Sequence, residues 1–358
     1  MNLTEILGGL PTEAISIWPV VPLRRHPEAD AIDEAVVDWL VGHGLCEPGS
    51  TQARSHVAAT LANALSFGRA KAVAAYAYYG TWAFLWDDHL DALAADPLEL
   101  GHHIAEANWA LTAPFTAYLP DNKWLVSLRD SRRFWEDSWD PAAVERMTAA
   151  NADWFMGQLS KAMLMRRPTA PTVSEVLRMR LQKAGMWSAA TATANAGGYR
   201  LSAAEHADPR VRAFMYAAYG PAAVLNEFLG VAKELVKPET GRTNLVSAIA
   251  CEHALDLAAA ITTAWELYER IGCLALALQA QLLHDVRPNV ARLAAELPQW
   301  IPATVDIMTT SVRYQEIPGH GVLDVPTVTL TDTPVFWDPQ DLTPPPYPDI
   351  AWWWDQLA

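Results

Sequence analysis

The longest uncharged apolar run in the chain, AVAAYAYYGTWAFLW at residues 72–86, restricts the possible folds more than any other segment. If residues 72–91 form one helix, that helix is apolar around its whole circumference up to Trp86. A membrane span needs about 20 apolar residues, so a run of 15 is too short to cross a bilayer. We therefore predict a buried central helix, surrounded by other helices, in a protein with no membrane insertion.

Most of the remaining sequence also predicts helices. Apolar residues recur at helical spacing in segments such as ADWFMGQLSKAMLMRR at 152–167, and Gly and Pro fall mainly between such segments. The sequence has no alternation of strands and helices, no glycine-rich phosphate-binding loop and no fixed-period repeat. Its 358 residues, 51% hydrophobic and 19% charged, allow one large core. We predict an all-α fold with a single helical domain over residues 1–316.

Residues 317–358 differ from this pattern. They contain TPPPYPD and then IAWWWDQLA, with little helical periodicity. Three adjacent tryptophans rarely lie in free solvent, so this irregular Pro- and Trp-rich tail is expected to pack back on the domain. The alternative is that the tail acts as a lid over a site.

The charge of the chain restricts its partners. The net charge is −15 and no basic stripe is present, so nucleic acid is not expected to bind. The three cysteines, Cys46, Cys251 and Cys273, show no paired or zinc-like spacing, and no basic leader precedes an apolar segment at the N-terminus. We therefore expect reduced cysteines in a cytoplasmic protein.

Three carboxylates, Asp87, Asp88 and Asp91, follow the apolar run directly. The C-terminal end of a helix carries partial negative charge, so these side chains oppose the helix dipole. Their spacing puts Asp87 and Asp91 on one face, one turn apart. A divalent cation would relieve the repulsion, and magnesium suits such hard oxygen ligands. The cluster alone does not identify a function, because a solvated acidic helix end is the alternative.

A second polar group of residues lies in LNEFLGVAKELVKPETGR, which begins at Leu225. Asn226, Gly230 and Glu234 recur every four residues and form one stripe on a helix. Asn226 and Glu234 supply oxygen atoms, whereas Gly230 leaves room for water or a metal. Lys233 places a cation beside Glu234. Alone, this segment is equally consistent with a surface helix that carries one ion pair.

The two segments together resemble the bacterial class I terpene synthases. These enzymes carry an aspartate-rich DDxxD motif on one helix and an (N/D)DxxSxxKE-type motif on a facing helix. The matching residues are Asp87, Asp88 and Asp91 in the first motif and Asn226, Lys233 and Glu234 in the second. Glu227 stands in place of an Asp, and Gly230 in place of the metal-binding Ser, as in some branches of the family. The resemblance implies that water fills this ligand position.

Two further positions carry the same resemblance, which covers roughly residues 15–316. The family has a diphosphate-sensing Arg about 46 positions before the second motif, where this chain has Arg180. The neighbouring Arg178 is an alternative sensor. The family also has an Arg-Tyr pair about 80 positions after the second motif, where this chain has Arg313 and Tyr314.

One position departs from the family pattern. Relatives often have Thr or Asp three positions after the sensor Arg, followed by a small residue. Here these positions hold Lys183 and Ala184, and Gly185 follows. The resemblance implies that the carbonyl of Ala184, on a broken helix, is the effector group that meets the substrate.

The resemblance implies the all-α class I terpenoid synthase bundle around a deep apolar active-site cavity, with a prenyl diphosphate as substrate. Three Mg²⁺ ions would bridge the diphosphate, two through the first motif, chiefly Asp87, and one through Asn226 and Glu234. Hydrogen bonds to phosphate oxygens would come from Arg180, Lys233, Arg313 and Tyr314. Ionisation would release diphosphate and an allylic cation, which cyclises away from water to a terpene hydrocarbon or alcohol. A homodimer is a further expectation from the family.

The predicted cavity wall follows from helical spacing before the first motif and from positions near the other motifs. It consists of Tyr76, Gly80, Ala83, Phe84, Trp187 and Ile307. Many relatives that make fifteen-carbon products carry an aromatic residue at the positions of Ala83 and Ile307. Together with Gly80 and Ala184, these smaller residues favour geranylgeranyl diphosphate over farnesyl diphosphate.

Two other functions stay open. A chain-elongating prenyl diphosphate synthase, a prenyltransferase with the same fold, needs two aspartate-rich motifs, and this chain has one. A non-catalytic isoprenoid-binding helical protein would not need the metal and diphosphate residues. A protonation-started cyclase would need a DxDD motif, which the sequence lacks.

Overall fold

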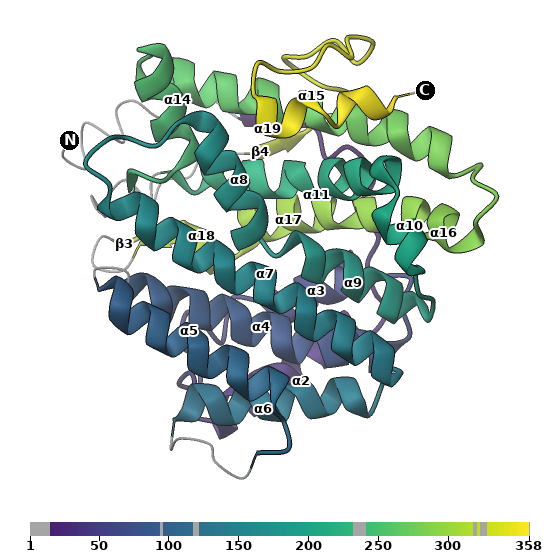
Figure 1. Ribbon diagram of the computed structural model, residues 1–358. Coiled ribbons are helices and arrows are strands. Elements are labelled where there is room, and N and C mark those ends of the chain that lie inside the picture. The colour runs from purple at the N-terminus through teal and green to yellow at the C-terminus, as the bar shows by residue number, and fades with distance from the viewer. Residues whose placement is uncertain are drawn as a thin grey trace.

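The computed structural model describes residues 15–93, 96–116, 122–231, 241–317, 321–322 and 328–357. Helices dominate these ranges, and the prediction of an all-α fold is confirmed (Figure 1). The first helices along the chain are α2 (Ala29–Gly42), α3 (Val57–Ala64), α4 (Ala70–Leu93), α5 (Pro97–Thr112), α6 (Lys123–Glu136), α7 (Pro141–Arg166), α8 (Val173–Lys183), α9 (Met186–Gly197) and α10 (Ala203–Ala207). The later helices are α11 (Pro209–Leu229), α14 (Leu245–His253), α15 (Leu257–Leu282), α16 (Pro288–Glu296), α17 (Trp300–Thr310), α18 (Val312–Gln315) and α19 (Pro348–Ala351), with the 3₁₀ helices η1 (Leu297–Gln299) and η2 (Trp354–Gln356).

The strands of the described ranges are short and form two small sheets. Strand β1 (Ile15–Ile17) pairs in parallel with β4 (Val328–Leu330), with Ile15 opposite Val328. Strand β2 (Glu316–Ile317) pairs antiparallel with β3 (Gly321–Val322). The first pair joins the start of the described chain to its C-terminal segment.

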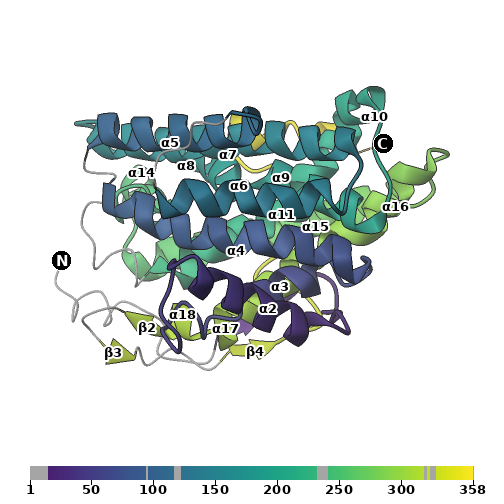
Figure 2. The same ribbon diagram turned by 90° about the horizontal axis from the view of Figure 1, so that it is seen from below.

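The predicted central helix is α4, which extends slightly beyond the predicted range. Its Trp82 and Trp86 are almost fully buried, and their rings stack with centroids 5.0 Å apart. The helix contacts α2, α3, α5, α6 and α9, and Figure 2 shows it in the interior of the bundle. Because the apolar part is enclosed on all sides, the acidic residues of its last turns mark one end of the core.

The junction between α8 and α9 is a sharp break. Helix α8 begins with a capping box, in which the Thr172 side chain and the Glu175 side chain each bind the other residue's backbone N–H. The helix ends at Lys183, and Gly185 then adopts φ +74°, which is in the left-handed region. A residue with a Cβ atom would be strained there, so the glycine lets the chain turn into α9.

The described tail residues, 328–357, pack back onto the bundle and lie along α15 in Figure 1. The fully buried carboxylate of Glu269 on α15 accepts the N–H groups of Val335, Phe336 and Trp337 at 2.7, 2.6 and 3.0 Å. Four tail side chains are buried, namely Tyr347, Ile350, Trp353 and Trp354. Three hydrogen bonds to one carboxylate fix the course of the tail at this point. The division into a domain and a tail at residue 316 stays a prediction.

Within the described residues, no helix on its own has the length and hydropathy of a membrane span. The consecutive helices α14 and α15 meet this criterion only together, and the chain bends by 114° between them.

Candidate active site

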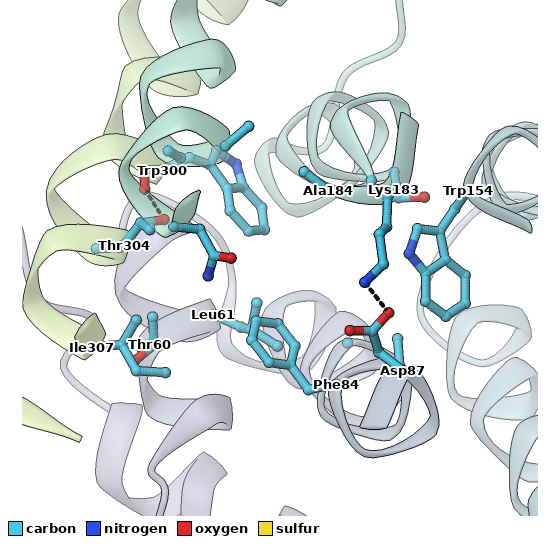
Figure 3. A pocket seen from close by; sticks show the side chains of 18 of the residues that line it. Thr60, Leu61, Phe84, Asp87, Trp154, Lys183, Ala184, Trp300, Thr304 and Ile307 are labelled. Carbon is cyan, nitrogen blue, oxygen red and sulfur yellow. Dashed lines mark hydrogen bonds and ion pairs between the residues drawn. The ribbon is translucent and has the colours of Figure 1, made fainter. Parts of the chain in front are cut away.

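One cavity inside the bundle is lined by residues of α3, α4, α7, α8, α9, α11, α17 and α18 (Figure 3). Its apolar wall includes Leu61, Tyr76, Tyr79, Gly80, Ala83, Phe84, Trp154, Tyr219, Trp300 and Ile307. Its charged and polar lining includes Asp87, Asp88, Asp91, Arg180, Lys183, Asn226, Arg313 and Tyr314. Along α4 the lining changes from aromatic and small residues to carboxylates, so the cavity suits a ligand with an apolar body and a charged head.

Five of the six predicted wall residues line this cavity, and Trp187 does not. Trp187 lies in a separate hollow with Tyr216, Trp352 and Trp353. Its ring contacts Tyr216 edge-on, with centroids 5.8 Å apart. The break at Gly185 changes the direction of the chain, so the inward face of α8 does not continue into α9. The prediction for Trp187 therefore requires correction.

Each carboxylate of the first motif forms an ion pair with a cation from another helix. Lys183 at the end of α8 reaches Asp87, with 2.6 Å between Nζ and Oδ1, as Figure 3 shows. The other two pairs are Arg313 of α18 with Asp88, at 2.6 and 2.9 Å, and Lys161 of α7 with Asp91, at 2.7 Å. The sequence predicted that a metal relieves the repulsion between these acids. The structure shows that the chain also compensates their charges itself.

Asp87 accepts two hydrogen bonds at one of its oxygens. Its Oδ1 accepts hydrogen bonds from Lys183 Nζ and from Gln158 Nε2, each at 2.6 Å. Burial acts to raise the pKa of Asp87, but the positive charges of Lys183 and Lys161 and the two hydrogen bonds outweigh it and hold the pKa below its usual value. The carboxylate is therefore ionised at neutral pH.

The predicted sensor Arg180 is held by residues of α11. Its Nε lies 2.8 Å from Glu227 Oε1, and its Nη2 donates to Asn226 Oδ1. Glu227 is itself buried, and its Oε2 accepts the N–H of Leu245 at 2.8 Å, at the start of α14. The alternative sensor Arg178 lies elsewhere: it is exposed and faces Asp349 of the tail at 3.8 Å. Of the two arginines, only Arg180 lines the cavity.

The second motif is described only in part. Asn226 donates through Nδ2 to the hydroxyl of Tyr314 at 3.3 Å, which links α11 to the Arg-Tyr pair. Gly230 follows the end of α11 and lines the cavity, and a Cβ atom there would lie 2.5 Å from the carbonyl oxygen of Asn226. The glycine thus permits close packing of the backbone. Lys233 and Glu234 lie outside the described residues.

The predicted effector carbonyl belongs to Ala184, at the end of α8. Its oxygen accepts a hydrogen bond from the hydroxyl of Tyr219 at 2.7 Å, and both residues line the cavity. Burial raises the pKa of Tyr219 to about 12, so its hydroxyl stays protonated and can donate this bond. The interaction fixes the carbonyl at the helix break.

Arg313 carries one donor that is left without a partner in the described part of the chain. Its guanidinium lies over the ring of Phe84, with 5.4 Å between the carbon atom Cζ and the ring centroid. Its Nε is buried and has no hydrogen-bond partner among the described residues. A buried donor without a partner is costly, and the positive charge of this guanidinium at the cavity favours an anionic ligand there.

The donor set fits magnesium that is shared with a phosphate-bearing ligand. In the part of the chain that the structure describes, no three His, Cys, Asp or Glu side chains form a ready-made metal cage. Carboxylate oxygens of α4 and the amide oxygen of Asn226 on α11 nevertheless line one cavity. Magnesium is usually held by one or two carboxylates together with water and substrate phosphates, which such a set allows.

Sequence reasoning did not identify several residues of the site. Trp154 and Trp300 line the cavity but have no sequence signal that separates them from the other tryptophans, of which the chain has 16. Gln158 and Lys161 lie three residues apart on one face of α7, and this face meets the acids of α4. The sequence alone does not show which face of α7 packs against α4. Lys183 was noticed as a departure from the family, without a role.

Comparisons with known proteins agree with this geometry. Residues 78–271, more than half of the chain, match the family described as "Terpene synthase family 2, C-terminal metal binding". Bonnadiene synthase of Allokutzneria albata is 28% identical, with 96% of this chain and 98% of that protein covered. The farnesyl diphosphate-cyclizing (+)-T-muurolol synthase of Streptomyces clavuligerus is 23% identical, with 92% and 79% covered.

The fold has solved counterparts. The crystal structure of the SVS_A2 protein, obtained by ancestral sequence reconstruction, superposes with a TM-score of 0.73 at 22% identity. The match covers 97% of this chain and 99% of that one. The family match, the fold and the acid-lined cavity lead to one conclusion: the chain belongs to terpene synthase family 2, a family of bacterial class I terpene synthases.

Proposed function

We propose that this terpene synthase ionises a linear prenyl diphosphate in a Mg²⁺-dependent step and cyclises the resulting cation to a terpene hydrocarbon or alcohol. The observation that carries the proposal is the polarity of this cavity, whose aromatic wall ends at the acids of α4 and the cations that face them. A prenyl diphosphate has the matching polarity, with an apolar chain and a multiply charged head.

The charged end of the cavity would bind the diphosphate. We assign the metal-holding oxygens to Asp87, with Asp88 and Asp91 in support, and to Asn226, with three ions as in the family expectation. When bound, Mg²⁺ supplies electrostatic stabilisation of the negative charge that develops on the leaving diphosphate. Glu234 would complete this set, and Gly230 leaves room for a water molecule.

Protein donors would share the charge of the leaving group. Arg180 and Arg313 are guanidinium groups at the cavity, and their positive charges would attract phosphate oxygens. Tyr314 would contribute its hydroxyl, and Lys233 its ammonium. Preorganised donors of this kind stabilise charge as it forms, which is how an ionisation step is accelerated.

The apolar end would protect the carbocation. The aromatic rings of Phe84, Trp154 and Trp300 line the cavity, and their faces stabilise a nearby cation while excluding water. The carbonyl of Ala184, held by Tyr219, would present its partial negative charge to the allylic carbon.

Geranylgeranyl diphosphate is the substrate we favour, with farnesyl diphosphate second. Gly80, Ala83 and Ile307 all line the cavity, and none of them fills it with an aromatic ring. Farnesyl diphosphate stays in consideration because the name of one relative, (+)-T-muurolol synthase, states that it cyclises farnesyl diphosphate.

The test is incubation of the full chain with ten-, fifteen-, twenty- and twenty-five-carbon prenyl diphosphates and Mg²⁺, followed by gas chromatography with mass spectrometry. We expect pyrophosphate release and cyclic products, strongest with the twenty-carbon substrate, and no reaction in EDTA. Elongated diphosphates in the presence of isopentenyl diphosphate would instead indicate a prenyltransferase. Substrate binding with no pyrophosphate release from any substrate would indicate an isoprenoid-binding protein and refute the proposal.

A further inference from the structure

Lys183 occupies a position where relatives often carry Thr or Asp, and its side chain enters the active-site cavity. Its side chain is 6% exposed, and its ammonium group lies 2.6 Å from Asp87 Oδ1 (Figure 3). This carboxylate is the first candidate ligand for Mg²⁺. A cation of the chain therefore contacts one oxygen of the carboxylate that a metal would bind, so the two positive charges would lie side by side and repel each other.

The backbone at Lys183 is packed closely against α7. Gly157 of α7 lies directly against it, since a Cβ atom at Gly157 would be 2.5 Å from the backbone nitrogen of Lys183. The next residue, Gln158, donates to the same Oδ1 of Asp87. Two adjacent residues of α7 thus fix the Lys183 backbone and orient its carboxylate partner.

A buried ammonium group needs an anionic partner, because removing it from water is costly. If a metal takes Asp87, the Lys183 ammonium must exchange that carboxylate for another anion. The anion that enters this cavity with the metal is the diphosphate of the substrate. The four-carbon stem of lysine gives its ammonium the freedom to turn from one to the other.

We propose that Lys183 is a counter-ion of Asp87 that competes with Mg²⁺ and then becomes a donor to the diphosphate. Metal without anion would bind weakly, since its charge would lie beside the Lys183 ammonium on the same carboxylate. Metal together with diphosphate would bind well, because the ammonium gains phosphate oxygens as it leaves Asp87. Lys183 would thus couple metal binding to substrate binding. This inference rests on the proposed function and adds a binding residue to the same site.

Arg178 provides a matched control on the same helix. It lies five residues before Lys183, is 62% exposed, and faces Asp349 of the tail instead of the cavity. Replacing it by Met removes the same charge from α8 and leaves the site untouched. Any effect of net charge alone would therefore appear equally in Arg178→Met and Lys183→Met.

The experiment is isothermal titration calorimetry of the full chain with Mg²⁺ alone, and with inorganic pyrophosphate at saturating Mg²⁺. In Lys183→Met we expect Mg²⁺ alone to bind about tenfold more tightly and pyrophosphate to bind about tenfold more weakly. A change in affinity of about tenfold is the size expected from one charge-assisted hydrogen bond. Arg178→Met should match the wild type in both titrations. If Lys183→Met does not fold, Lys183→Gln removes the same charge while its amide can still donate to Asp87.

Two results separate the possible failures. A folded Lys183 variant with wild-type affinity for Mg²⁺, or with wild-type affinity for pyrophosphate, would overturn the role of Lys183 alone. A wild-type protein that binds neither Mg²⁺ nor pyrophosphate would overturn the proposed function as well.

Discussion

Replacing Glu227 by Gln tests whether a buried carboxylate holds Arg180 at the cavity. The two side chains are 3% and 12% exposed, and Glu227 Oε1 lies 2.8 Å from Arg180 Nε. Removing one charge of a buried ion pair costs about 3 kcal/mol or more. Unfolding entropy near 2.1 cal/mol/K per residue then converts about 3 kcal/mol into a fall in Tm of about 4 °C for a chain of this length.

The assay is thermal denaturation followed by circular dichroism, with kcat/KM measured on the same preparations. Turnover should fall at least about tenfold, because a sensor that is misplaced no longer meets the diphosphate. Glu227→Asp is the matched control, since it keeps the charge and restores the residue type of the family motif, and it should lose less in both measurements. A Gln variant that melts within about 1 °C of the wild type and turns over normally would refute the reasoning.

The remaining predictions concern the acidic motif, the cavity wall and a helix cap. Asp87→Ala should abolish pyrophosphate release and lower the free energy of unfolding by about 3 kcal/mol, because buried Lys183 loses its counter-ion. The double variant with Lys183→Met should recover most of that stability and none of the activity; a double variant no more stable than the single one would contradict this account. Ile307→Trp should shift relative turnover towards farnesyl diphosphate by about tenfold, measured by gas chromatography on both substrates, and an unchanged ratio would show that this wall does not limit chain length. The hydrogen bond from Arg167 lowers the pKa of Glu175 to about 2, so its stabilisation is complete above the usual value of about 4.3 and is lost as the pH falls towards 2. The difference in Tm between wild type and Glu175→Gln should follow that window, and a difference that does not depend on pH would argue against it.

The helical architecture could be predicted because burial leaves a periodic trace in the sequence. Helix α4 is predicted over 72–91 and observed over Ala70–Leu93, since a run that is apolar on all sides has few alternatives to a central helix. The resemblance prescribes the order and spacing of the site residues. For this reason the sequence could supply the acidic motif, and also Arg180 and Asn226, as candidates. The structure brings these candidates to one cavity.

The partners of these residues could not be predicted. Lys161 and Gln158 reach the acids of α4 only because of the rotation of α7 about its axis, which depends on the packing of the whole bundle. Trp187 shows a different error, because it was chosen for its position next to the break after α8, and the turn at Gly185 directs its side chain to another hollow. The pairing of β1 with β4 was also missed, since strands of three residues carry almost no periodic signal.

The β1–β4 pair has a consequence for the order in which the molecule is assembled. Ile17 is fully buried, and its carbonyl accepts the N–H of Thr331, a residue made more than 300 positions later. At roughly 5–20 residues per second, a ribosome needs roughly 15–60 s to reach that residue. During this interval β1 has been synthesised but β4 has not, so the hydrogen-bonding edge of β1 has no partner strand. Closure of the bundle at this edge therefore has to wait until Thr331 has been made, and the nascent chain must keep the edge from foreign strands until then.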